Sequence, residues 1–365
     1  MTDAEALIHR LPKVELHLHL EGSVGPETLR EMARRKGRLA AETEGWIAER
    51  TRQGFRYPQF ADFLNAFKLV SLLLESPHDY ALAAARLVES LSAEKVHYAE
   101  VTLSAGVVLW KRQPLDAVFE AAAEAAQEAG RRCGVRVKWI FDAIRQFGAE
   151  HAREVARYAS RHRERGVVAF GIGGDEARGP ARDFVEVYRE AHEAGLRLTA
   201  HAGEAAGPES VRDAVELLGA ERIGHGTSAA RDPGTLRLLA ERRVPVEVCL
   251  TSNLATGAIA RVADHPLRRF LDASVPVVLS SDDPAMFATS MEREMMLAAE
   301  TFGLSGPEIL AIAGNAVSAA FASETERAAW HDDLQRAATQ PGEPRRQNAR
   351  LQETGTARRE RRKGY

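Results

Sequence analysis

The sequence predicts an α/β fold, a (β/α)8 TIM barrel, from three observations. Short β-branched or apolar runs alternate with longer stretches rich in Ala, Glu, Arg and Leu along the 365 residues. Eight such runs occur, and eight parallel strands with helices between them close a barrel. The sequence lacks the glycine-rich fingerprint after an early strand that a doubly wound open sheet favours, so the open sheet is the second choice.

The expected strands are short, and a helical pattern follows most of them. They are expected at Val14–His19, His97–Leu103, Val135–Asp142, Val167–Ile172, Leu196–Ala202, around Ile223, Val244–Cys249 and Val275–Ser280. The helical stretches include Asp79–Ser92, Leu115–Gly130, Ala149–Arg165, Ala181–Gly195, Pro208–Leu218 and Asp232–Arg242. One domain over residues 1–338 accommodates this pattern, because barrels of roughly 250 residues or more are routinely single domains.

The segment from about residue 27 to 77 is too long for one barrel connection and predicts a helical insertion after the first strand. Its aromatic side chains are Phe55, Tyr57, Phe60, Phe63 and Phe67. In the favoured interpretation they pack the insertion onto the barrel. In the alternative, some of them wall a substrate pocket as a lid, since barrel sites are built from βα connections.

Residues 339–365 are expected to form a disordered basic tail. The last 25 residues hold eight Lys or Arg against three Glu and almost no apolar side chains. RNA binding by this tail is an alternative, but solvated disorder fits the composition better. The net charge of −3 gives no reason to expect a nucleic-acid or membrane partner.

Cysteine usage and the N-terminal segment indicate a cytoplasmic protein. The two cysteines, Cys133 and Cys249, are far apart and form neither a disulfide framework nor a thiolate metal site. The N-terminal segment has no apolar core of signal-peptide length, and no apolar run approaches the ~20 residues that span a bilayer. The oligomeric state is not predictable from the sequence.

The first expected strand ends with two histidines, His17 and His19, in the run ELHLHLEG. Side chains two apart in a strand share a face, and barrel active sites lie at the carboxyl ends of the strands. The pair therefore predicts metal ligands, although a single histidine is more often structural.

Two further histidines end later strands. His201 precedes Glu204 in HAGE, where Glu204 is a candidate general acid or base. A helix-capping glutamate beside a buried histidine is the alternative. His225 lies between two glycines in RIGHG, which suits a catalytic or water-orienting imidazole, or a turn.

The last expected strand ends in two adjacent carboxylates, Asp282 and Asp283, in SSDDP. They repel each other unless a cation or hydrogen bonds hold them, and a helix cap explains only Asp283. The candidates on strand ends are thus His17, His19, His201, His225 and Asp282. Three histidines and an aspartate with room for water predict a catalytic zinc site. The other histidines are interpreted as structural or solvated: His9, His78, His97, His151, His162, His192, His265 and His331.

The segments PKVELHLHLEGS, HAGE, RIGHG and SSDDP resemble the four signature segments of the adenosine deaminase family, within the amidohydrolase superfamily. The resemblance extends from about Leu11 to about Ser323. It implies a hydrolase that replaces the 6-amino group of an adenine nucleoside by oxygen and releases ammonia. It also implies one Zn²⁺ per chain, because the strand at Val167–Ile172 holds no lysine to bridge a second metal.

The resemblance implies a role for each matched residue. The zinc ligands correspond by position to His17, His19, His201 and Asp282, with His19 also at the substrate. Glu204 resembles the residue that protonates purine N1, and His225 the one that orients and helps deprotonate the zinc-bound water. Asp283 resembles the acceptor that holds purine N7, and Gly174 the backbone contact to N3.

Three departures from adenosine deaminases concern the substrate. Glu21 stands where those enzymes usually carry Asp near the ribose, and Thr102 where they usually carry Arg. The loop Gly171–Gly179 is short, and HAGEAAGPESVRDAV with RIGHGTS looks like the deaminases of 6-amino-6-deoxyfutalosine in bacterial menaquinone synthesis. That substrate is an adenine nucleoside enlarged at the 5′ end.

Alternatives remain for the substrate, the class of protein and the metal. Free adenine is one, because adenine deaminases of this family often have Glu at the position of Glu21. A non-catalytic barrel that serves as a binding module is another, disfavoured because every matched residue is present. The expected partner is a small-molecule purine nucleoside, with no nucleic acid or membrane. Several divalent ions suit three histidines and an aspartate, so zinc competes with iron and manganese.

Overall fold

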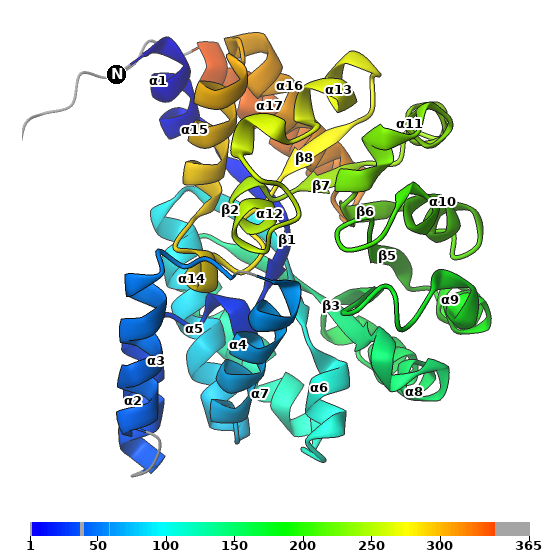
Figure 1. Ribbon diagram of the computed structural model, residues 1–365. Coiled ribbons are helices and arrows are strands. Elements are labelled where there is room, and N and C mark those ends of the chain that lie inside the picture. The colour runs from blue at the N-terminus through cyan, green and yellow to red at the C-terminus, as the bar shows by residue number, and fades with distance from the viewer. Residues whose placement is uncertain (1, 37–39, 58, 340–365) are drawn as a thin grey trace, which may run out of the picture.

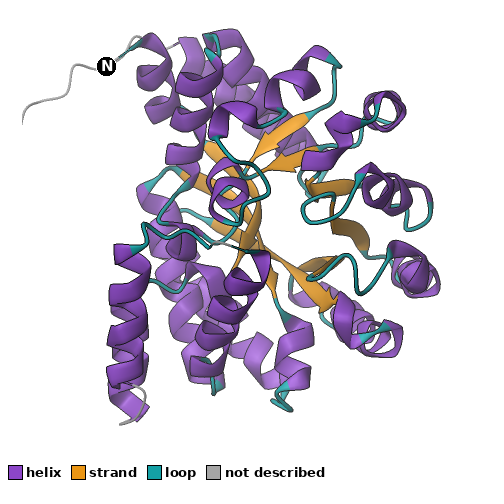
Figure 2. Ribbon diagram, in the orientation of Figure 1, coloured by secondary structure: helices purple, strands orange, loops and turns teal. Residues whose placement is uncertain are grey.

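The structure, a computed structural model, describes residues 2–36, 40–57 and 59–339 and confirms the predicted barrel. Eight parallel strands pair in chain order, and helices surround them (Figure 2). The strands are β1 Lys13–His19, β2 Val96–Leu103, β3 Arg136–Ile144, β4 Val167–Gly173, β5 Arg197–Ala202, β6 Arg222–His225, β7 Val246–Val248 and β8 Val277–Leu279.

The barrel closes between its first and last strands through Asp282, three residues after the end of β8. Leu18 and Asp282 form a parallel bridge. The N–H of His19 donates to the carbonyl oxygen of Asp282 at 2.9 Å, and the N–H of Asp282 donates to the carbonyl oxygen of His17 at 3.0 Å. This closure distinguishes the fold from a doubly wound open sheet and fixes the backbone of Asp282 beside the end of β1.

The helices between strands run along the outside of the barrel (Figure 1). They are α5 Pro77–Ala93, α7 Leu115–Cys133, α8 Ala149–Arg161, α9 Val185–Glu193, α10 Pro208–Glu216, α11 Pro233–Glu241, α13 Leu267–Asp272 and α16 Gly306–Ala319. Short helices follow some strand ends: α6 Ala105–Trp110, α12 Leu250–Ala255 and α14 Pro284–Phe287. Near the two ends of the chain, α1 Asp3–Arg10 packs against both α15 Met291–Phe302 and α17 Glu324–Thr339.

Strands β7 and β8 begin later than expected. Each starts directly after a proline, Pro245 or Pro276, whose carbonyl oxygen accepts an N–H from a neighbouring strand. Proline has no N–H to donate, so it does not continue the ladder. The helix expected over 149–165 ends at Arg161, and the one expected over 181–195 begins as a 3-10 turn at Ala181–Phe184.

The segment between β1 and β2 contains the helices of the predicted insertion. They are α2 Pro26–Lys36, α3 Ala40–Arg52 and α4 Phe60–Leu73. At the other end of the chain, α17 reaches Thr339, and residues 340–365 of the expected tail lie outside the described residues. Within the described ranges, no helix is both long and apolar enough to cross a membrane.

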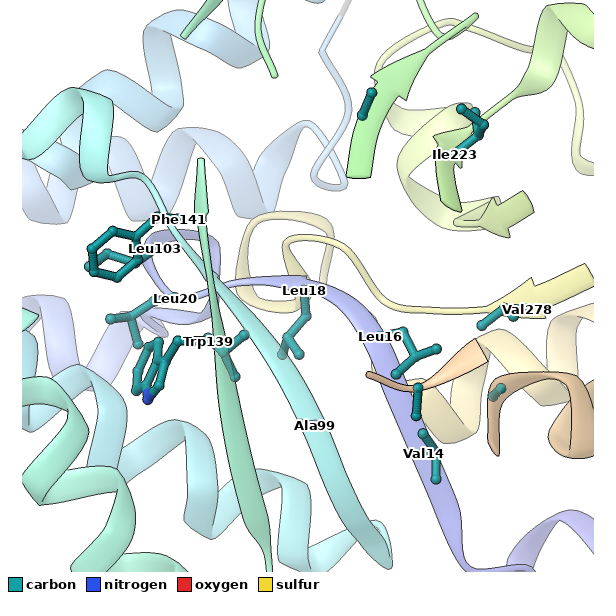
Figure 3. Packing of buried hydrophobic residues seen from close by; sticks show 14 of the residues in the cluster. Val14, Leu16, Leu18, Leu20, Ala99, Leu103, Trp139, Phe141, Ile223 and Val278 are labelled. Atoms are coloured by element: carbon teal, nitrogen blue, oxygen red, sulfur yellow. The ribbon is translucent and has the colours of Figure 1, made fainter. Parts of the chain in front are cut away.

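The apolar core lies between the barrel and its helices, and β1 shows how it positions the site. Leu16, Leu18 and Leu20 belong to this core, where Leu20 lies near Trp139 and Phe141 of β3 and Leu16 lies nearer Val278 of β8 (Figure 3). Successive side chains of a strand point to opposite faces, so the intervening histidines face the barrel interior.

Candidate active site

A cavity of about 390 Å³ opens at the carboxyl ends of the barrel strands. Its walls include six of the residues singled out from the sequence: His19, His201, Glu204, His225, Asp282 and Asp283. The fold thus brings into one cavity side chains that lie far apart along the chain. His17 is buried directly beside them, with its ring centroid 4.6 Å from that of His201.

Helix α4 turns one face toward this cavity and forms a wall. Most lining members recur three or four residues apart, and the full set is Phe60, Phe63, Leu64, Asn65, Phe67, Lys68, Ser71 and Leu72. Tyr57 instead packs on Phe287 and donates its hydroxyl to the carbonyl oxygen of Met286 at 3.0 Å. The aromatic set of the insertion therefore divides, because some members anchor it to the barrel and the α4 aromatics wall the cavity.

Four side chains converge on the cavity floor: His17, His19, His201 and Asp282. One ligand atom from each lies within 4.8 Å of the others. Oδ1 of Asp282 is 3.2 Å from Nε2 of His17 and 3.4 Å from Nε2 of His19. Nε2 of His19 is in turn 3.2 Å from Nε2 of His201. Three imidazole nitrogens and a carboxylate oxygen at these separations can hold a divalent metal ion.

Hydrogen bonds behind two of these rings turn their lone pairs toward the centre. Nδ1 of His17 lies 2.8 Å from Oε2 of Glu247, and Nδ1 of His201 lies 3.2 Å from the carbonyl oxygen of Ile172. Both partners accept, so both Nδ1 atoms carry a proton, and each Nε2 is the ring nitrogen that can bind a metal ion. Nε2 of His17 is buried, has no hydrogen-bond partner among the described residues and lies 3.2 Å from Oδ1 of Asp282, so the donor set fits a metal ion.

Glu247 belongs to a buried ionic network behind His17. Its other oxygen, Oε1, accepts from Nε of Arg222 at 2.6 Å, and Arg222 also pairs with Glu100 at 2.7 Å. Burial alone would raise the pKa of Glu247, but Arg222 and His17 hold that pKa below its usual value. An ionised Glu247 keeps the proton of His17 on Nδ1.

Glu204 and His225 face each other beside the cluster. Nε2 of His225 is 3.6 Å from Oε2 of Glu204. Burial, together with the negative charges of Asp282 and Glu176, raises the pKa of Glu204 well above its usual value. Such a shift favours the protonated carboxyl group, the form that a general acid requires.

A second carboxylate, Glu176, shapes the loop that carries Glu204. It is buried and accepts the backbone N–H groups of Gly203, Glu204 and Ala205 at 2.7, 2.9 and 2.8 Å. It also accepts the hydroxyl of Ser210. These bonds satisfy the N–H groups of a turn that no strand or helix pairs.

Two residues of the site adopt left-handed backbone conformations that are rare outside glycine. The φ angle is +63° at His225 and +64° at Asp282. Such conformations cost of order 1–3 kcal/mol each and persist where the surroundings hold them. At Asp282 the bridge to β1 holds the backbone.

Asp283 presents an unsatisfied carboxyl oxygen to the cavity. It is buried, and Oδ1 has no hydrogen-bond partner among the described residues. Burial and the adjacent Asp282 raise the pKa of Asp283 well above its usual value. Gly22 makes room for this side chain, because a Cβ at position 22 would lie 1.7 Å from Oδ1 of Asp283.

The remaining two predicted substrate residues lie in different places. Gly174 lines the cavity with φ +93°, and a Cβ there would lie 2.5 Å from Oε1 of Gln146. Glu21 is buried, is absent from the cavity lining, and accepts the N–H of Ser104 at 3.1 Å. Burial raises the pKa of Glu21 to about 7.

Sequence reasoning missed Glu247, Glu176 and Asn253, which act behind the cavity. Glu247 is the middle residue of an otherwise apolar strand, VEV, and a charge at such a position is a signal that was available. Asn253 lies in α12 and contacts Nδ1 of His225, and no local pattern marks it.

Comparison with known proteins covers nearly the whole chain. A family model described as Adenosine deaminase matches residues 12–337. The chain is 37% identical to an aminodeoxyfutalosine deaminase of Streptomyces coelicolor over 91% of this chain and 86% of that protein. It is 36% identical to an adenine deaminase of Rhizobium leguminosarum bv. trifolii over 87% and 97%.

Solved structures agree with the fold. The structure of an adenine deaminase from Arthrobacter aurescens superimposes with a TM-score of 0.83 at 28% identity, covering 89% of this chain and 98% of that one. An amidohydrolase from Burkholderia ambifaria with bound Zn superimposes with a TM-score of 0.82 at 26% identity, over 93% and 94%.

Proposed function

We propose, from the premise that this chain belongs to the adenosine deaminase family, that it hydrolyses the 6-amino group of an adenine nucleoside enlarged at the 5′ end. Membership makes the chain a hydrolase that acts on carbon–nitrogen bonds. The proposed substrate is 6-amino-6-deoxyfutalosine, with adenosine second. The products are the 6-oxo nucleoside and ammonia.

The outer half of the cavity carries this choice of substrate. Trp110 and Phe147 line it and stack with ring centroids 5.9 Å apart, and Trp110 is 49% exposed. Nζ of Lys68 lies 5.9 Å from the Trp110 ring, and Arg178 also lines the cavity. A 5′ substituent would pack on these rings, with the two cations in reach of any negative group it carries. Free adenine would leave this half unused.

The proposed cofactor is one zinc ion per chain. Its ligands would be His17, His19, His201 and Asp282, whose arrangement fits a cation. The zinc-bound relative from Burkholderia ambifaria supports zinc among the divalent ions. Bound zinc lowers the pKa of a coordinated water from about 15.7 towards about 7, which supplies hydroxide at neutral pH.

Protein groups would bind the purine ring and move its protons. Glu204, whose pKa is raised by burial, would donate a proton to ring nitrogen N1 and make C6 electrophilic. Purine N7 carries no hydrogen, so a protonated Asp283 would donate to it rather than accept from it. The N–H of Gly174 would reach N3, and His225 would hold the attacking oxygen.

Turnover measurements on the zinc-loaded protein test the proposal. We expect kcat/KM to be highest for 6-amino-6-deoxyfutalosine, lower for adenosine and lowest for adenine, with ammonia release as the readout. Trp110→Ala should lower kcat/KM about tenfold on the enlarged nucleoside, the loss of roughly 1.4 kcal/mol of ring packing, and spare adenosine. Leu217→Ala, at an exposed leucine outside the cavity, is the control. A higher kcat/KM for adenine than for either nucleoside would refute the proposal that the substrate is a nucleoside.

A further inference from the structure

A chain of three buried side chains leads from the cavity to the backbone behind it. Nδ1 of His225 lies 3.1 Å from Nδ2 of Asn253, and Oδ1 of Asn253 lies 3.2 Å from Nε2 of His265. Nδ1 of His265 accepts the backbone N–H of Leu267 at 3.1 Å. The three side chains belong to residues no more than 3% exposed, so bulk water does not compete for these bonds.

The backbone N–H of Leu267 sets the direction of every bond in this chain. An N–H only donates, so Nδ1 of His265 accepts and carries no proton. The ring then carries its proton on Nε2 and donates it to Asn253, whose contacting atom must be the carbonyl Oδ1. The opposite end of the amide, Nδ2, therefore donates to Nδ1 of His225. Burial also lowers the pKa of His265 to about 3, which keeps this ring neutral.

We infer that Asn253 and His265 are positioning residues that hold His225 in the tautomer with its proton on Nε2. This nitrogen is the one that faces the cavity, 3.6 Å from Oε2 of Glu204. A proton on Nδ1 of His225 would face an N–H of Asn253. These hydrogen bonds therefore disfavour both the tautomer of His225 with its proton on Nδ1 and the doubly protonated, charged ring. The sequence interpretation of His265 as structural or solvated did not anticipate this role.

The consequence for the reaction rests on the proposed function. A neutral His225 with its proton on Nε2 donates a hydrogen bond to the attacking oxygen and does not take a proton from it. Glu204 then carries each proton. It protonates N1, and its carboxylate receives the proton of the attacking water as the bond from oxygen to C6 forms. It passes that proton to the amino nitrogen as the C6–N bond breaks, and it recovers one from the new hydroxyl as ammonia leaves.

The isosteric variant Asn253→Asp tests the inference. A carboxylate only accepts, so it would take the N–H of His265 and require a proton on Nδ1 of His225. Nitrogen-15 NMR of metal-loaded protein with labelled histidine reports which ring nitrogen carries the proton, whatever the activity. We expect the proton on Nε2 in the wild type and on Nδ1 in the variant. In the variant kcat should fall about 10²- to 10⁴-fold while KM changes less than about threefold.

Two variants of His265 decide the question if Asn253→Asp does not fold. His265→Gln keeps an N–H donor toward Asn253, so it should retain the Nε2 proton of His225 and a kcat within about fivefold of wild type. His265→Phe removes the donor and should lower kcat more than about tenfold with a mixture of tautomers. Identical tautomers and rates in these two variants would contradict the inference.

The NMR readout separates this inference from the proposed function. A wild-type protein with the proton of His225 on Nδ1 overturns the positioning role, even if the enzyme deaminates purines. If His225 carries its proton on Nε2 but the protein deaminates none of the purines, the proposed function is wrong, while the positioning role of Asn253 and His265 is supported.

Discussion

Replacing Glu247 by Gln tests whether the buried network behind His17 prepares the metal site. Glu247 is 2% exposed and never reaches the cavity, so an effect on metal binding must pass through His17. The substitution keeps the shape of the side chain and removes its charge. Its consequence follows from the hydrogen-bonding groups on either side.

Both neighbours of Glu247 donate. Nδ1 of His17 lies at 2.8 Å and Nε of Arg222 at 2.6 Å, and a glutamine offers only one oxygen to the two. Its NH₂ group must face one donor, which removes a hydrogen bond to a charged group worth about 1.5–3 kcal/mol. Arg222 keeps Glu100 at 2.7 Å, so its charge stays paired and the fold should survive. Loss of such an orienting partner lowers metal affinity about 10- to 100-fold, or roughly 1.4–2.8 kcal/mol.

Competition with a chelating dye measures the Kd for zinc in the wild type and in Glu247→Gln. Glu150→Gln changes the same residue type at a side chain that is 88% exposed and is the matched control. Denaturant unfolding of both metal-free proteins shows whether the loss is local to the site. A Kd within about twofold of wild type would refute the orienting role of Glu247.

Three further predictions concern other parts of the site. Glu204→Gln should keep one metal per chain and lose about 10²- to 10⁴-fold in kcat, because the proton is gone and the shape remains; near-normal turnover would contradict its role as the acid. Gly22→Ala should displace Asp283, since a Cβ would lie 1.7 Å from its Oδ1. It should raise KM about tenfold and cost about 1–3 kcal/mol of stability, and an unchanged KM would count against Asp283 as a substrate ligand. Burial lowers the pKa of His265 to about 3, so below pH 6.5 only the unfolded chain binds this proton and stability falls as pH drops. The loss between pH 7 and pH 5 is about 2 kcal/mol, and denaturant midpoints should show that His265→Gln removes it.

The sequence was sufficient to predict the barrel and the meeting of the candidate ligands. His17 and His19 alternate with leucines that belong to the core, so the strand period alone places them on the opposite face. The carboxyl ends of all strands meet at one end of a barrel, which brings His201 and Asp282 to the same cavity.

The supporting residues could not be predicted in the same way. Asn253 contacts both His225 and His265 from a short helix after β7, His265 lies in the loop that follows this helix, and neither residue lies in a periodic pattern. Strands β7 and β8 start after Pro245 and Pro276, later than the apolar pattern predicts, because proline has no N–H for the ladder. Such contacts depend on how separate segments of the chain pack against each other, and local sequence patterns do not determine that packing.

The position of Asp282 joins the fold and the chemistry at one point. Its backbone pairs with His17 and His19 and closes the barrel, while its carboxylate faces the Nε2 atoms of the same two residues. The left-handed φ of +64° at Asp282 is therefore held from both sides, by the bridge and by the side-chain cluster. A cation bound at this cluster would be held by the carboxylate of Asp282 and the Nε2 atoms of His17 and His19, which belong to the seam between β1 and the segment after β8. Metal binding and barrel closure then stabilise each other, because both act on the same three residues.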